Sequence, residues 1–133
     1  MRLGDRITLA RLATPPLLPS LLADTEPRVA EAALLNARLR EEDLVSALRR
    51  VDVRPALVAA SAESSRWQPS YAVKLALVLQ PKTPLPVALP RLLALVPRDL
   101  SRVASDAALH PLVRAAASGI LEQAGQDSTA QRD

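Results

Sequence analysis

Prolines divide this chain into short segments and limit how long any of its helices can be. Twelve of the 133 residues are prolines, and proline is tolerated in a helix only in the first turn, where its missing N–H needs no partner. In Thr14-Pro15 and Thr83-Pro84, the Thr hydroxyl is expected to cap a helix that the Pro begins. The sequence predicts nine short helices, at about residues 5–13, 15–23, 27–37, 41–50, 55–63, 69–80, 84–95, 98–105 and 111–124.

The most apolar part of the chain is Ser70–Leu93. It contains one expected helix, a Pro-Lys-Thr break and a second expected helix, and Lys74 is its only charge before the break. A helix that is apolar on all sides is buried or lies between other helices. Pro90 falls inside the second helix and is expected to kink or split it.

Composition indicates an all-α fold. Hydrophobic residues make up 49% of the chain, which has no Phe, one Trp and one Tyr. The core must therefore consist of Leu, Ala and Val, and no strand-like alternation is evident. We expect one all-α domain over residues 1–124, followed by a flexible polar tail over residues 125–133.

Other features of the sequence bear on compartment. The chain has no Cys, which excludes disulfides, thiolate metal sites and a Cys nucleophile and fits a reducing compartment. The N-terminal segment carries charges within its apolar part, unlike a signal peptide. The best candidate for a membrane span, Leu85–Val96, is too short and contains Pro86, Pro90 and Arg91. We therefore expect a soluble, cytoplasmic protein with no membrane span.

The sequence matches itself weakly at an offset of 44 residues. Arg28–Leu48 aligns with Ala72–Leu92, so that Asn36 falls on Gln80, and a third copy begins near Leu112. A period of about 40–47 residues with two or three helices is typical of helical solenoids such as HEAT and armadillo arrays.

Particular residues in this match resemble the leucine-rich repeat variant family, which belongs to the HEAT-like solenoids. One copy has Asp24, Val29, Asn36 and Leu44, and another has Val73 followed by the turn Gln80-Pro81-x-Thr83-Pro84. The chain departs from the family pattern in having Gln80 where Asn is usual. The resemblance implies a short right-handed HEAT-like superhelix of about nine helices. Some members carry an iron–sulfur cluster on a Cys-rich segment, but this chain has no Cys, so we expect no cofactor.

No group of residues predicts catalysis. The only His, His110, precedes Pro111 at a helix start and is expected to be a loop residue near a cap rather than a base or ligand. Glu41, Glu42 and Asp43 could bind a cation, but their place in a first helical turn already explains them. We expect a protein that is not an enzyme and has no catalytic or metal site.

Two sets of residues are candidates for partner binding. Trp67 and Tyr71 lie four residues apart and would act as anchors if exposed; the favoured alternative is that they fill a gap in a core without Phe. The segment between Glu63 and Asp99 has no acidic residue. The basic residues of this region are Arg66, Lys74, Lys82, Arg91, Arg98 and Arg102. They form either a strip that binds an anionic partner or a set of isolated solvated charges, and we favour the second interpretation.

These observations leave three hypotheses for function. The first is a non-catalytic adaptor or scaffold that binds another protein on the surface of stacked helices. The second is a binder of nucleic acid or another polyanion through the basic residues between 66 and 102. The third is a structural subunit in which a neighbour covers Leu85–Val96. The sequence does not predict the oligomeric state.

Overall fold

The computed structural model describes the backbone of residues 2–132 and the side chains of residues 2–127, and within this part every regular element is a helix. The elements are α1 (Leu3–Leu12), η1 (Pro15–Leu17), α2 (Leu18–Leu22), α3 (Pro27–Leu34), α4 (Glu41–Leu48), α5 (Pro55–Glu63), α6 (Tyr71–Leu79), α7 (Leu85–Arg91), η2 (Leu92–Ala94), α8 (Pro97–Ala104) and α9 (Pro111–Arg132), where η marks a 3₁₀ helix. The prediction of an all-α chain is confirmed, and each of the nine expected ranges overlaps one α-helix.

Prolines begin many of these helices, as the sequence predicts. Pro is the first residue of η1, α3, α5, α8 and α9. The expected Thr caps are absent, however: Thr14 makes no capping bond through its side chain, and Pro84, not Thr83, is the N-cap of α7. The amides of Leu17 and Val87 donate instead to the backbone carbonyls of Thr14 and Pro84, both at 3.0 Å. Backbone bonds thus replace the expected hydroxyl bonds.

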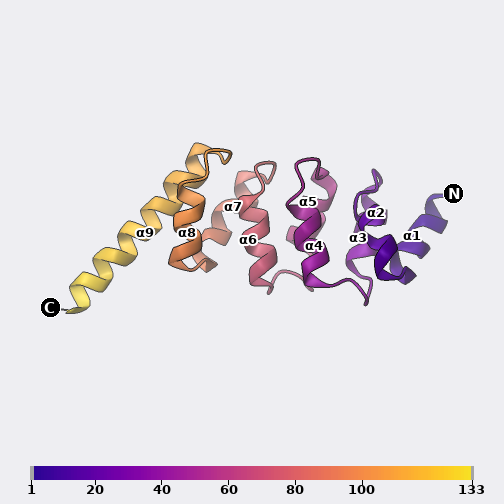
Figure 1. Cartoon of the computed structure of the whole chain (residues 1–133), viewed down its shortest axis with the longest axis horizontal. Helices are drawn as coiled ribbons and strands as arrows, with labels where there is room; N and C mark the ends of the chain where they lie inside the picture. The colour runs from indigo at the N-terminus through magenta and orange to yellow at the C-terminus, as the bar shows by residue number, and fades with distance from the viewer. Residues whose placement is uncertain (1, 133) are drawn as a thin grey trace.

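The helices lie in two rows along an elongated molecule (Figure 1). In the first row, α2 contacts α4, α4 contacts α6 and α6 contacts α8; in the second row, α3 contacts α5 and α7 contacts α9, while α1 packs on α3. We call each of the pairs α2–α3, α4–α5, α6–α7 and α8–α9 a layer. In Figure 1 the layers follow one another from the N-terminal end to the C-terminal end.

The spacing of layers differs from the 44-residue match found in the sequence. Helices α4, α6 and α8 begin at residues 41, 71 and 97, so successive layers start 30 and 26 residues apart. The offset of 44 places α3 and α4, which begin at 27 and 41, on α6 and α7, which begin at 71 and 85. It therefore superimposes a helix of one row on a helix of the other, because both are followed by the same kind of turn.

The core consists of two clusters of Leu, Val and Ala that meet at α6. Val73, Ala76 and Leu77 belong to a cluster that extends back to Ala10, whereas Val78 belongs to one that extends forward to Ala117. Because α6 lies between the two clusters, it needs apolar residues around most of its circumference. Lys74, its only charge, is half-buried.

Two details at the C-terminal end complete the comparison with the sequence. As expected, the helix containing Pro90 is divided, since α7 ends at Arg91 and a 3₁₀ turn follows. Helix α9 passes residue 124, where the sequence predicts a flexible tail, and its backbone stays helical to Arg132. The side-chain Nε2 of Gln123 donates to the Oδ1 of Asp127 one turn later at 3.2 Å, and this bond stabilises the extension. The side chains of the tail beyond residue 127 lie outside the described residues.

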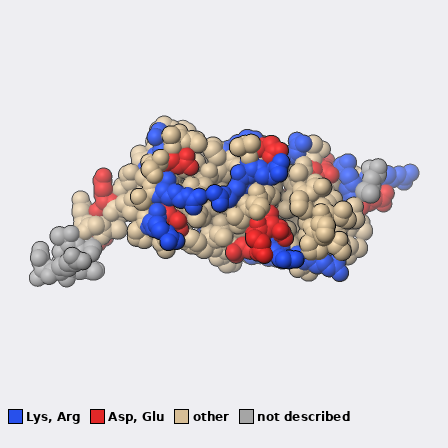
Figure 2. All heavy atoms as spheres, viewed as in Figure 1, with Lys and Arg blue, Asp and Glu red and all other residues tan. Residues whose placement is uncertain are grey.

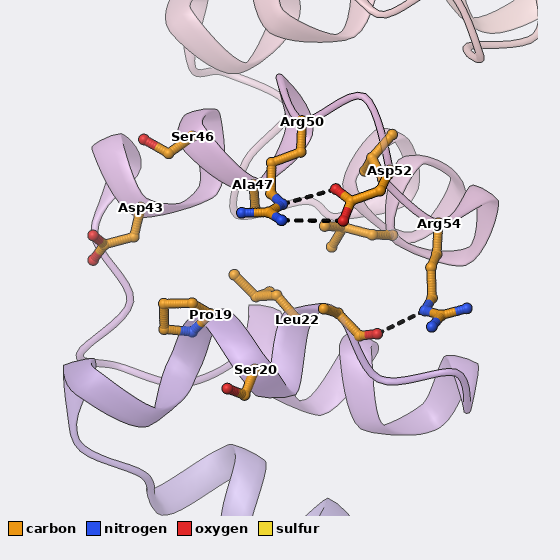
Figure 3. Close-up of a pocket in the computed structure, with 12 residues that line it drawn as sticks. Pro19, Ser20, Leu22, Asp43, Ser46, Ala47, Arg50, Asp52 and Arg54 are labelled. Carbon is orange, nitrogen blue, oxygen red and sulfur yellow. Dashed lines mark hydrogen bonds and ion pairs between the residues drawn. The ribbon is translucent and has the colours of Figure 1, made fainter.

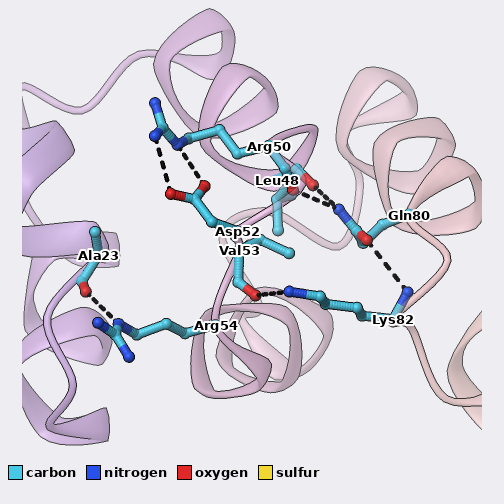
Figure 4. Close-up of polar contacts among 8 residues, drawn as sticks. All are labelled: Ala23, Leu48, Arg50, Asp52, Val53, Arg54, Gln80 and Lys82. Carbon is cyan, nitrogen blue, oxygen red and sulfur yellow. Dashed lines mark hydrogen bonds and ion pairs between the residues drawn. The ribbon is translucent and has the colours of Figure 1, made fainter.

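Amide side chains connect successive layers through the carbonyls at helix ends. The Asn36 Nδ2 donates to the carbonyls of Ala10 and Ala13 at 2.8 and 2.9 Å, and its Oδ1 accepts from the Arg38 amide. Gln80, which follows α6 in the other row, makes the same kind of contact. Its Nε2 donates to the carbonyls of Leu48 and Arg50 at 2.7 and 3.0 Å (Figure 4). The carbonyls of Ala10 and Leu48 lie in the last turns of α1 and α4, and those of Ala13 and Arg50 lie just beyond these helices, so the amides supply donors that the helices lack.

Basic side chains make the same kind of contact. Each reaches back to the preceding layer, or to α1, and donates to a backbone carbonyl at or just beyond a helix end. The pairs are Arg38 with Leu12, Arg54 with Ala23, Arg66 with Leu34, Asn36 and Leu39, Lys82 with Val53, and Arg91 with Ala62. Leu12, Ala23, Leu34 and Ala62 lie at the C-terminal ends of helices, where the helix dipole places partial negative charge that favours a cation, whereas Leu39 and Val53 lie in loops just before the next helix.

Replacing Asn36 with Asp tests the importance of this contact. The carboxylate keeps the acceptor for the Arg38 amide but cannot donate to the carbonyls of Ala10 and Ala13. We expect Asn36→Asp to lower the free energy of unfolding by about 2–4 kcal/mol at neutral pH, measured by urea denaturation. The exposed position Arg11→Ala serves as a control, and an Asn36→Asp variant as stable as the parent would contradict this role.

Candidate functional site

Both predicted aromatic anchors lie between layers. The Trp67 side chain is buried, its Nε1 donates to the Leu34 carbonyl at 3.2 Å, and the Arg66 guanidinium lies 4.6 Å from the ring centroid. Tyr71 is 37% exposed. Trp67 therefore fills a gap in the core, which is the alternative that the sequence favoured, and its ring has little surface to offer a partner.

Tyr71 joins α6 to the start of α8. Its hydroxyl donates to the buried carboxylate of Asp99 at 2.5 Å and accepts from the Val96 amide at 3.1 Å. Partial burial raises the pKa of Tyr71, and the hydrogen bond to Asp99 raises it further. This phenol is therefore fully protonated at neutral pH and serves as a structural donor.

The predicted basic residues separate into two groups. Arg66, Lys82 and Arg91 donate to helix-end carbonyls and so take part in packing. Replacing these three with Glu would test the stability of the fold as much as partner binding. Of the others, Lys74 is half-buried in α6, while Arg98 and Arg102 are exposed on α8.

The structure brings Lys82 and Arg102 together with a third cation, Arg49. All three line one cavity of about 310 Å³, at the ends of α4, α6 and α8. Figure 2 shows a band of Lys and Arg side chains crossing the face over these helices. Arg49 is not among the basic candidates predicted from the sequence, because only the packing of layers brings it beside Lys82 and Arg102.

The position of this cavity follows from a difference between two turns: Gln80 with its amide follows α6, whereas Asp106 with its carboxylate follows α8. Gln80 and Asp106 each accept a bond from the amide two residues later, at 3.2 and 3.0 Å. Gln80 also donates back to the preceding layer, but a carboxylate has no donor at neutral pH. In the described part of the chain no side chain of the last layer donates to the end of α6, and the cavity opens there, with Asp106 in its lining.

A second, larger cavity lies between α2, α4 and the start of α5. Its volume is about 420 Å³. Leu22, Val53 and Leu57 are buried and form its floor. The other lining residues are Pro19, Ser20, Ala23, Asp43, Ser46, Ala47, Arg50, Asp52 and Arg54. An apolar floor with a polar rim is the usual composition of a binding pocket.

Charged groups on this rim are fixed by hydrogen bonds. The Arg50 guanidinium donates to both carboxylate oxygens of Asp52 at 2.8 and 3.0 Å, and this contact lowers the pKa of Asp52. The Arg54 Nε donates to the Ala23 carbonyl at 2.7 Å. Figure 3 shows the Arg50–Asp52 pair on one side of the cavity and Pro19 and Leu22 on the other. The two cavities adjoin along the segment after α4, because Arg49 and Val51 line the smaller cavity whereas Arg50, Asp52 and Val53 line the larger one.

The remaining candidates for chemistry have structural partners. His110 Nδ1 accepts from the Leu112 amide at 3.0 Å at the start of α9. Glu41 in the first turn of α4 accepts from the Ser70 hydroxyl at 2.7 Å. Among the residues that the structure describes, no cluster of three or more His, Asp or Glu side chains is arranged to hold a metal ion. Likewise, no described helix combines the length and apolarity needed to cross a bilayer.

The two groups of basic residues should differ in their effect on stability. Arg66→Glu removes three bonds to backbone carbonyls, at 3.2, 2.6 and 2.9 Å, and is expected to cost about 2–4 kcal/mol in the free energy of unfolding. Arg102→Glu changes the same charge at an exposed site without such bonds and should stay within about 0.5 kcal/mol of the parent. Urea denaturation compares the two, and equal losses would contradict the division.

We expect Tyr71 to make the free energy of unfolding depend on pH in the alkaline range. Since its folded pKa lies above the unfolded value of about 10, its contribution to stability is complete below that value. The contribution is lost as pH rises through the folded pKa. Tyr71 is the only Tyr in the chain, so tyrosinate absorbance of the folded protein and of the protein in urea gives both pKa values directly. Tyr71→Phe should remove this part of the alkaline loss of stability, and a folded pKa no higher than the unfolded one would contradict the assignment.

A scan of protein-family models finds no match to this chain, and searches of curated proteins and of solved structures find none either.

Proposed function

We propose that this chain is a non-catalytic protein-binding module, an adaptor or scaffold built as a short right-handed HEAT-like stack of helix pairs. The observation that carries the proposal is the pair of adjoining cavities at the helix ends of the first row. Stacked layers give a continuous surface on which an extended partner can contact several helices at once.

The chemistry of the surface supports a protein partner. Pro19 and Ala23 expose apolar surface in the lining of the larger cavity, above the buried Leu22, Val53 and Leu57, and charged and hydroxyl side chains surround them. This pattern of apolar centre and polar rim is typical of protein interfaces. Val51, which is 91% exposed, lines the smaller cavity and immediately precedes Asp52 of the larger one. An exposed β-branched side chain between two cavities is well placed to contact a partner.

The groups in the two linings also support a binding role over a catalytic one. The acidic residues are Asp43, Asp52 and Asp106, and Asp52 is paired with Arg50. The two hydroxyls are Ser20 and Ser46, and no His lies in either lining. Neither lining brings a nucleophile and a base within hydrogen-bond distance among the described residues, whereas covalent catalysis depends on such a pair.

A structural subunit is the second candidate, supported by two exposed apolar side chains. Leu93 is 78% exposed and Val96 46% exposed, whereas Leu92 and Leu95 of the same segment are buried within the chain. A neighbour would therefore cover only part of Leu85–Val96. A subunit of this kind should elute in gel filtration above the 14.2 kDa mass of the monomer.

Site-specific photo-crosslinking tests the proposed binding surface. A benzophenone amino acid is introduced at Ser46 or Val51, which are exposed at the cavities, and at Ala59, an exposed residue of α5 that lines neither. In cells of the source organism, we expect the first two positions to give one defined protein adduct and Ala59 to give none.

Filling the larger cavity provides the control for this experiment. Ser20→Trp places a large ring at the rim without removing any side-chain hydrogen bond of the described structure. It should abolish the adduct at Ser46 while the far-ultraviolet circular dichroism stays unchanged. Equal adducts at Ser46 and Ala59, or no adduct at either cavity position, would contradict the proposal.

A further inference from the structure

We infer that the partner segment bound by this surface is an extended acidic peptide, with an apolar side chain in the larger cavity and carboxylates on Arg49 and Arg102. The inference rests on the proposed function and specifies the chemistry of the ligand. It depends on three observations: two unpaired guanidinium groups, an adjoining apolar pocket and the spacing of the helices between them.

The first observation is that Arg49 and Arg102 are exposed and have no acidic partner within the described residues. They line the smaller cavity together with Lys82, whose Nζ donates one of its three N–H groups to the Val53 carbonyl at 3.1 Å. The helix-end carbonyls of Leu48 and Arg50 beneath them already accept bonds from Gln80. The two guanidinium groups are thus free to bind carboxylates, for which their paired N–H donors are well suited.

The balance of charge over both cavities points the same way. Their basic lining residues are Arg49, Arg50, Arg54, Lys82 and Arg102, and their acidic ones are Asp43, Asp52 and Asp106. Asp52 neutralises Arg50 through its paired bonds. The surface therefore keeps an excess of positive charge, with the unpaired arginines beside the smaller cavity, so acidic residues of a ligand would be drawn to that end.

The spacing of the cavities defines the length of the ligand. The larger cavity lies between α2 and α4, and the smaller one extends from the end of α4 to α8. Packed helices lie about 8–10 Å apart, so the two centres are separated by roughly two such spacings. An extended chain advances about 3.3 Å per residue. A peptide would therefore cross this distance in about five residues, passing over Val51.

Three features favour a peptide over a single-stranded nucleic acid. Bases need exposed aromatic rings for stacking, but Trp67 is buried and Tyr71 lies outside both cavities. Asp43 in the larger cavity would repel a phosphate backbone, which is charged along its whole length, whereas a peptide needs carboxylates only at Arg49 and Arg102. Finally, the exposed apolar surface of Pro19 and Ala23 in the larger cavity suits an aliphatic or aromatic side chain.

Selection from a displayed library of random dodecapeptides tests this inference on the full chain. We expect the selected peptides to share an apolar residue followed or preceded, about five residues away, by Asp or Glu. Binding of a labelled selected peptide is then measured by fluorescence anisotropy. Arg49→Glu combined with Arg102→Glu should weaken it by more than about tenfold. Arg2→Glu with Arg11→Glu makes the same charge change on α1 and should leave affinity within about twofold.

Changes in the peptide provide a measurement that does not depend on the folding of a variant. Replacing its Asp and Glu with Asn and Gln should weaken binding to the parent protein to a similar degree, and a dT oligonucleotide should not compete. Peptides without acidic residues, an unaffected double variant or efficient competition by the oligonucleotide would overturn the inference.

The two levels of proposal fail differently. If non-acidic peptides bind and Ser20→Trp blocks them, the surface binds proteins and only the acidic character is wrong. If no peptide is selected, or if Ser20→Trp and the arginine variants leave binding of every selected peptide unchanged, then both the inference and the proposed surface are wrong.

Discussion

The structure depends on satisfying the backbone carbonyls at the ends of short helices. Apart from α9, its α-helices have five to ten residues, and the last four carbonyls of any helix have no partner within it. In helices this short, those carbonyls are a large fraction of the backbone acceptors, and packing of layers removes many from water. Asn36 and Gln80 and the basic side chains that reach the preceding layer supply the donors. Stacking of the layers therefore requires these hydrogen bonds, and the bonds form only when the layers are stacked.

This requirement changes how the basic character of the chain is understood. A net charge of +3 is consistent with an anionic partner, yet Arg66, Lys82 and Arg91 mainly serve the backbone. What remains for recognition is a smaller set, of which Arg49 and Arg102 are the clearest members. The number of basic residues is thus a poor measure of the binding surface, since a guanidinium donor can satisfy a helix end as well as a ligand.

Local signals in the sequence predict the helices well, because prolines and apolar residues act within a few residues of their position. All nine expected ranges overlap a helix, and the buried position of Trp67 follows from the lack of Phe. The grouping of Arg49 with Lys82 and Arg102 could not be predicted in this way, since it depends on how three layers pack. Similarly, Gln80 and Asp106 look alike as turn residues, and only the structure shows that the amide bridges two layers while the carboxylate leaves a cavity. The 44-residue match aligns α3 and α4 with α6 and α7, and it reflects the similar turns that follow α3 and α6.

The position of α6 between two apolar clusters has a consequence for cooperativity. The cluster from Ala10 to Leu77 and the cluster from Val78 to Ala117 meet in this helix, and Val87 of α7 also packs against the first cluster, so each half of the molecule depends on the other mainly through α6. In stacked proteins, stability is approximately a sum over neighbouring units, and a single shared element determines whether those units melt together. The C-terminal half can therefore open as a sub-global unit while the N-terminal half remains folded, for as long as α6 stays docked on the first cluster.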